Sequence, residues 1–97
     1  MALALLIDTY LADAASKLTR LVELVDNRQG FDEAARIAHS LKSASAMAGA
    51  SALSQLAARV EMGLSQDTSV IDADVTIRMQ QHLTAYRAAL IERGLAA

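Results

Sequence analysis

The sequence predicts an all-α protein, and three features of its composition indicate this. Of the 97 residues, 21 are Ala and 14 are Leu, which are strong helix formers. Aromatic residues make up only 3 % of the chain, with no Pro and only 4 Gly, so residues that favour strands are scarce. A chain of this length forms one domain around one core, and we expect residues 1–97 to be that domain.

The first predicted helix runs from about Leu3 to Asp26. Its apolar residues recur at steps of three and four, which is typical of a helix that buries one face. This face consists of Ile7, Leu11, Ala14, Leu18, Leu21 and Val25. The segment ends at Asn27–Gly30, where Gly30 gives the backbone freedom to turn.

The second predicted helix runs from about Phe31 to Ala48, and Gly49 follows as a C-terminal stop. The side chains of one face are Phe31, Ala34, Ala38, Leu41 and Ser45. The third helix starts near Ser51, which is suited to be its N-cap. Its apolar face consists of Leu53, Leu56, Val60 and Leu64. Because so few residues separate these two helices, they are expected to form a hairpin.

The fourth predicted helix runs from about Ile71 to Arg93. Its apolar positions are Ile71, Val75, Met79, Leu83, Tyr86 and Leu90, with His82 at the boundary of the face. Asp72 and Asp74 in the first turn suit the helix dipole, as does Arg93 at the end. Four amphipathic helices with short links bury their faces together in an antiparallel, up-down-up-down four-helix bundle.

The composition excludes several kinds of function. There is no Cys, so disulfides, thiolate catalysis and Cys-based zinc sites are excluded. The two His are 43 positions apart without an acidic cluster near either, and no metal or other cofactor is expected. A net charge of −2 with scattered Lys and Arg does not indicate binding to nucleic acid or to a membrane. The apolar run Met1–Ile7 is too short for a membrane span and lacks the basic start of a signal peptide, so a cytoplasmic location is expected.

His39 is the residue whose surroundings suggest chemistry. On the second helix it shares an exposed face with small residues and one cation, namely Lys42, Ser43 and Ala46, with Ala35 and Arg36 a turn earlier. A neutral imidazole is nucleophilic and can form a phosphoramidate. A lysine ammonium can contact phosphoryl oxygens as a mobile point charge. Small side chains around His39 let the active site of another protein approach it.

The residues from His39 onward resemble a known family. The chain reads His39-Ser40-Leu41-Lys42-Ser43-Ala44-Ser45, with Gly49, Leu53 and Glu61 at 10, 14 and 22 positions after the His. This pattern is similar to the histidine-containing phosphotransfer (HPt) domains of two-component phosphorelays. The resemblance implies that His39 accepts the phosphoryl group and that Lys42 helps to stabilise it. It also implies that Glu61 hydrogen-bonds the imidazole, which fixes the tautomer and leaves Nε2 to attack.

One position departs from the family pattern, because Ser43 stands where the family usually has Gly. Ser is still small, so the departure concerns the range of partners more than the activity. The expected docking surface around His39 consists of Ala35, Arg36, Ser43, Ala46 and Ala50. The ordinary alternatives are that Lys42 is a solvated charge and that Glu61 is a surface carboxylate paired with Arg36 or Arg59.

The resemblance implies a phosphocarrier rather than an enzyme. It would accept phosphate from a receiver domain of a hybrid histidine kinase and pass it to the receiver domain of a response regulator, which supply Mg²⁺ and the catalytic groups. A monomer is expected, and no glycine-rich phosphate loop for ATP is present.

Two alternatives remain. One is a non-catalytic helical interaction module in which His39 is incidental. The other is the detached phosphotransfer domain of a chemotaxis-type histidine kinase, although a 97-residue chain that begins at Met1 favours a free-standing protein.

Overall fold

A computed structural model describes residues 2–66 and 73–95, and this part of the chain is all-helical with no strands. The four helices are α1 (Ala2–Asn27), α2 (Phe31–Met47), α3 (Ser51–Gln66) and α4 (Ala73–Glu92). The predicted start of the last helix at Ile71, and Asp72, lie outside the described residues. The sequence-based prediction of an all-α fold with four helices is therefore confirmed.

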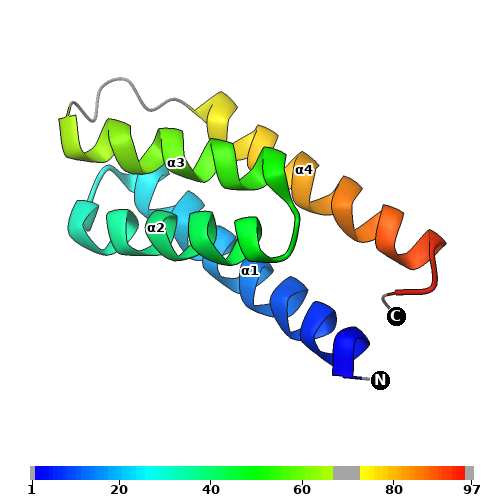
Figure 1. The fold of residues 1–97 in the computed structure, drawn as a ribbon. Helices are drawn as coiled ribbons and strands as arrows, with labels where there is room; N and C mark the ends of the chain where they lie inside the picture. The colour runs from blue at the N-terminus through cyan, green and yellow to red at the C-terminus, as the bar shows by residue number, and fades with distance from the viewer. Residues whose placement is uncertain (1, 67–72, 96–97) are drawn as a thin grey trace.

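The helices pack in the order α1–α2–α3–α4, and α4 closes the arrangement against α1. Figure 1 shows α2 and α3 side by side as a hairpin, with both termini of the chain towards one end. Within the described residues α2 and α4 do not pack side by side, so the two lie diagonally across the bundle. One side of α2 therefore faces solvent between the neighbouring helices α1 and α3.

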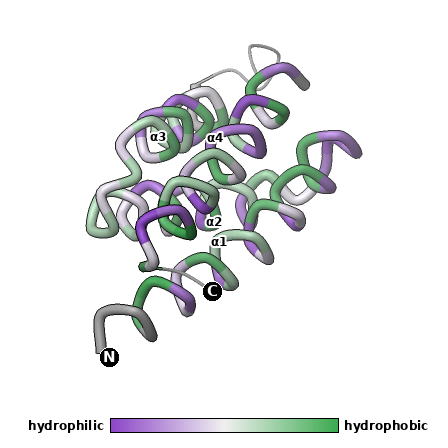
Figure 2. Tube along the Cα trace, turned by 90° about the vertical axis from the view of Figure 1, so that its right-hand side faces the viewer, coloured by the Kyte–Doolittle hydropathy of each residue, from purple (hydrophilic) through white to green (hydrophobic). Residues whose placement is uncertain are grey.

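The core draws side chains from all four helices, and Figure 2 shows hydrophobic and hydrophilic segments alternating along them. The largest fully buried apolar side chains are Leu21, Leu41, Leu53, Val60 and Met79. At the end of α1 the core also includes Leu24, which the prediction left out, while Val25 is half-buried and packs against the core. The cause is the turn into α2, since a Cβ on Gly30 would lie 2.8 Å from the Leu24 side chain.

The turn after α1 ends the helix in a way that the sequence did not indicate. The N–H of Gln29 donates to the Leu24 carbonyl at 3.2 Å and the N–H of Arg28 to the Val25 carbonyl at 3.2 Å. These two bonds form a Schellman motif, which needs a left-handed residue between them. That residue is Arg28, with φ of 52°, whereas Gly30, with φ of 65°, comes just before α2. Gly30 thus begins the second helix rather than ending the first.

The turn between α2 and α3 follows the prediction at Gly49, which has φ of 80°. The N–H of Ala50 donates to the Ser45 carbonyl at 2.8 Å, and the N–H of Ser54 donates to the Ala50 carbonyl at 3.0 Å. Ala50 therefore holds the N-cap position of α3, and the prediction of Ser51 as N-cap is wrong by one residue. This three-residue link fixes the register of the hairpin.

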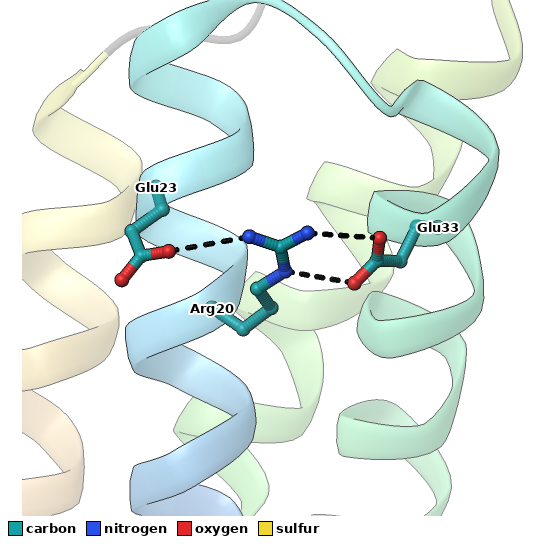
Figure 3. Close-up of polar contacts among 3 residues, drawn as sticks. All are labelled: Arg20, Glu23 and Glu33. Atoms are coloured by element: carbon teal, nitrogen blue, oxygen red, sulfur yellow. Dashed lines mark hydrogen bonds and ion pairs between the residues drawn. The ribbon is translucent and has the colours of Figure 1, made fainter.

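Polar contacts join the helices near both ends of α2. Figure 3 shows Arg20 of α1 between Glu33 of α2 and Glu23. Its Nε lies 2.8 Å and its Nη2 3.1 Å from the two carboxylate oxygens of Glu33, and its Nη1 lies 3.3 Å from Oε2 of Glu23. At the other end, the Tyr10 hydroxyl lies 2.6 Å from the buried Ser45 hydroxyl. The Tyr86 hydroxyl donates to the Ala48 carbonyl. These contacts hold α1 and α4 against the end of α2.

Candidate functional site

His39 lies in the third turn of α2, and its side chain is 62 % exposed. Ala38, directly before His39, and Leu41, two residues after it, are buried in the core and fix the rotation of α2. Because positions 38 and 41 face inward, His39 is directed to solvent. His82 is also exposed, but it lies on α4, diagonally across the bundle from α2.

A carboxylate from the neighbouring helix holds the imidazole. Nδ1 of His39 lies 2.7 Å from Oε2 of Glu61 on α3. A carboxylate oxygen only accepts, so Nδ1 donates the proton in this contact, and Nε2 of the neutral ring keeps its lone pair. The contact joins residues 22 apart, and the short α2–α3 link brings them into register.

The other oxygen of Glu61 is also occupied. Nζ of Lys42 donates to Oε1 of Glu61 at 2.6 Å, while the Lys42 side chain is 35 % and the Glu61 side chain 27 % exposed. The hydrogen bond from Lys42 holds the pKa of Glu61 below its usual range; partial burial opposes this shift and the contact with His39 supports it. Glu61 is therefore a carboxylate at neutral pH and a constant acceptor for the imidazole.

Two side chains that the sequence analysis missed support this turn of α2. Lys17 of α1 donates to the Ser40 hydroxyl at 2.6 Å, and the Ser54 hydroxyl of α3 donates to the Lys42 carbonyl at 2.8 Å. The turn is therefore held from both neighbouring helices. No single-helix spacing predicts such contacts, because each depends on how two helices pack. For Lys17 the sequence indicates only a pairing within α1, with Asp13 four residues earlier.

The residues of the predicted docking surface do not all lie at the surface. Arg36, Ser43 and Ala46 are exposed, and Ala35 is half-buried. The prediction is wrong for Ala50, which is 5 % exposed and part of the core. Its carbonyl and N–H are both used in the tight turn that joins α2 to α3, and this turn draws the methyl group inward. We therefore remove Ala50 from the docking surface.

The comparison with protein families decides the identity of the fold. The family model described as the Hpt domain matches residues 5–90, which is most of the chain. The chain belongs to the Hpt domain family. Hpt domains carry out histidine phosphotransfer in two-component signalling, and they are phosphocarriers rather than classical enzymes. They interact with receiver domains and response regulators in phosphorelays.

No curated protein and no solved structure matches the chain at a significant level. None of the described helices is both long and apolar enough to cross a membrane. The described residues contain no group of three or more side chains suited to hold a metal ion.

Proposed function

We propose that His39 accepts a phosphoryl group from the aspartyl phosphate of a receiver domain in a hybrid histidine kinase. The group then passes to the aspartate of a response regulator. The observation that carries this proposal is the exposed imidazole whose Nδ1 is held by the Glu61 carboxylate at 2.7 Å. This contact orients a nucleophile on the outside of a rigid helix, where a partner can reach it.

The transfer step uses few groups of this chain. The lone pair of His39 Nε2 attacks phosphorus, the bond between phosphorus and the aspartate oxygen breaks, and the aspartate leaves as a carboxylate. The positive charge that develops on the ring is offset by Glu61 through the Nδ1 proton. Lys42 has three N–H donors, and its contact with Glu61 uses one, so the others can stabilise phosphoryl oxygens. Mg²⁺ and the remaining catalytic groups come from the receiver domain.

The rest of the proposal concerns how the protein meets its partners. Residues 1–97 act as one monomeric, cytoplasmic domain, an up-down-up-down bundle that presents α2 to the receiver. The docking surface is formed by Ala35, Arg36, Ser43 and Ala46 around His39. Small side chains there let the receiver aspartate come close to Nε2, because only a short distance separates the reacting atoms in such a transfer.

The direct test is phosphate transfer from purified receiver domains. Each receiver domain of the source organism is phosphorylated and incubated with the protein, and the protein is then assayed for acid-labile, base-stable phosphate. Labelling by one or a few receiver domains is the expected result. If no receiver domain labels the protein, it is a helical interaction module, and if only an ATP-binding kinase domain does so, it is a chemotaxis-type phosphotransfer domain.

Substitution of Glu61 separates orientation from charge. Glu61→Gln is expected to retain much of the transfer rate, because an amide oxygen still accepts the Nδ1 proton. Glu61→Ala is expected to lose more, because the ring becomes free to rotate and to change tautomer, but less than loss of His39 itself. Transfer rates and ¹⁵N chemical shifts of the His39 ring, which report the tautomer, are the measurements. Unchanged rates and shifts in Glu61→Ala would make Glu61 an ordinary surface carboxylate.

Because the pKa of Glu61 is lowered, the difference in stability between wild type and Glu61→Gln is expected to depend on pH. A carboxyl whose pKa is lower in the folded state stabilises the fold above its unfolded value of about 4.5. That contribution is lost as the pH falls through the lower folded value. Wild type is therefore expected to unfold at a higher denaturant concentration than Glu61→Gln at pH 7, and the difference is expected to vanish in acid.

Changes at Ser43 test whether the partner approaches over α2. Ser43 is exposed one turn after His39, so Ser43→Tyr is expected to keep the fold but to slow transfer more than tenfold, about 1.4 kcal/mol. Ser43→Gly is expected to keep or raise the rate, with a loss of about 0.5 kcal/mol in helix stability. Kinetics of transfer from the receiver and urea unfolding are the measurements. Equal rates for the Tyr and Gly variants would show that the partner does not dock over this face.

A further inference from the structure

An exposed groove lies on the outer side of α4. The inner side of this helix buries Thr76, Met79 and Leu90 in the bundle. The groove on the outer side is lined by residues of α4 alone, which are Ile77, Gln80, Gln81, Thr84, Ala85 and Ala88. Ile91 continues the same side of the helix one turn later, and Ile77 and Ile91 are 48 % and 46 % exposed. A single helix therefore has one apolar side in the core and a second one in solvent.

The shape of the groove suits another helix. Its lining forms two adjacent ridges of α4 with four-residue steps, one of Ile77, Gln81 and Ala85 and the other of Gln80, Thr84 and Ala88. Two helices pack when a ridge of one lies in the groove between two such ridges of the other. Because three of the lining side chains are Thr or Ala, the backbone of a second helix can approach closely.

The charge of this side of α4 indicates what kind of helix fits. The protein has a net charge of −2, yet residues 75–91 contain Arg78 and Arg87 and no Asp or Glu. Within the described part of the chain, neither arginine is in an ion pair. With 3.6 residues per turn, the two arginines lie on opposite sides of the apolar stripe. A partner helix with acidic residues on both flanks of an apolar face complements this pattern.

Two other occupants fit less well. A second copy of the chain would bring the arginines of both copies together, without an acidic residue between positions 75 and 91 to balance them. A helix that lies on a membrane surface has large apolar side chains along its apolar face. Here the middle of the stripe consists of Gln80, Gln81 and Thr84. The observations therefore favour a protein helix.

We infer that the outer groove of α4 binds an acidic amphipathic helix of another protein. Apolar side chains of that helix lie between the two ridges, and its carboxylates pair with Arg78 and Arg87. Because α4 lies diagonally across the bundle from α2, its outer side points away from the solvent-facing side of α2. A bound helix thus holds the protein to a partner and leaves His39 open. The inference does not depend on the role of His39.

A pair of designed peptides tests this inference. Both have Leu along one face of about three helical turns and are held helical by a staple on the opposite face. One carries Glu on both flanks of the Leu face, and the other carries Lys there. Titration of ¹⁵N-labelled protein with the Glu peptide is expected to shift the amide signals of residues 77–91 and not those around His39. The Lys peptide is expected to bind about tenfold more weakly.

Substitutions assign the contact to the groove. Ile77→Gln and Ile91→Gln are each expected to weaken binding of the Glu peptide about tenfold. Combining Arg78→Gln with Arg87→Gln is expected to remove most of the dependence of this binding on salt concentration. Leu6→Gln is the matched control, because Leu6 is 66 % exposed on α1 and does not line the groove. Circular dichroism checks that every variant is folded.

Each contrary outcome overturns the inference. It is wrong if the Glu peptide does not bind, if both peptides bind equally, or if the shifted signals lie on α2. Equal weakening by Leu6→Gln would show that the peptide binds any exposed apolar side chain. Sedimentation of the protein with anionic lipid vesicles, lost in Ile77→Gln, would make the occupant a membrane. A dimer in light scattering that Ile77→Gln converts to a monomer would make it a second copy of the chain.

Discussion

Replacing His39 with Ala or Gln is expected to abolish phosphate uptake from every receiver domain. The reason is that Nε2 of His39 is the nucleophile of the proposed transfer. The side chain is 62 % exposed, so its loss is expected to change the free energy of unfolding by about 0.5 kcal/mol or less. The measurements are acid-labile phosphate on the protein and chemical unfolding of each variant.

His82→Gln is the matched control for this change. His82 is exposed on α4, away from α2, so its replacement is expected to leave phosphate uptake unchanged. Phosphate on His39→Ala in amounts like those on wild type would mean that another residue is the acceptor. If His39→Ala is unfolded, His39→Gln decides instead, because Gln keeps a side chain of similar size. Phosphate retained on His39→Gln after incubation with phosphoramidate, a small phosphoryl donor, would disprove the assignment.

Truncating the core of the hairpin is expected to have the largest effect on stability. Leu41 of α2 and Leu53 of α3 are each 1 % exposed, and both belong to the central cluster. Leu41→Ala and Leu53→Ala are each expected to lower the free energy of unfolding by about 2–5 kcal/mol, because each removes buried methyl groups and leaves a cavity. Urea unfolding at a fixed protein concentration is the measurement.

Leu6→Ala gives the corresponding control at an exposed position. Leu6 is 66 % exposed, so its truncation is expected to change stability by about 0.5 kcal/mol or less. Losses near zero for both Leu41→Ala and Leu53→Ala would show that the rotation of α2 and α3 is wrong. The assignment of His39 to the solvent side would then fail as well, because the same helix rotation fixes both.

The sequence was sufficient to predict the features that depend on one helix at a time. The repeat of apolar residues located α1 to α4, and the positions of Ala38 and Leu41 directed His39 outward. The spacing of 22 residues between His39 and Glu61 indicated their contact only through a family resemblance, because hairpin register is not a property of either helix.

The features that the sequence did not predict depend on two elements at once. The left-handed Arg28 and the burial of Leu24 follow from how the turn folds back on α1. Ala50 is drawn into the core by a link only three residues long. The Tyr10 hydroxyl bonded to Ser45 explains a buried serine that the helical pattern alone treats as a small residue. Each requires the distance between helices, which local spacing does not contain.

The shared carboxylate of Glu61 also determines how substitutions at this site must be interpreted. His39 and Lys42 each bond a different oxygen of the same group, at 2.7 and 2.6 Å. Removing Lys42 thus changes two things, namely the cation proposed to contact the phosphoryl group and the contact by which Glu61 holds the imidazole. Effects of residues that share a partner are not additive. The separate contribution of Lys42 is therefore obtained only from a double-mutant cycle with Glu61, and a single Lys42 variant measures the three side chains as one unit.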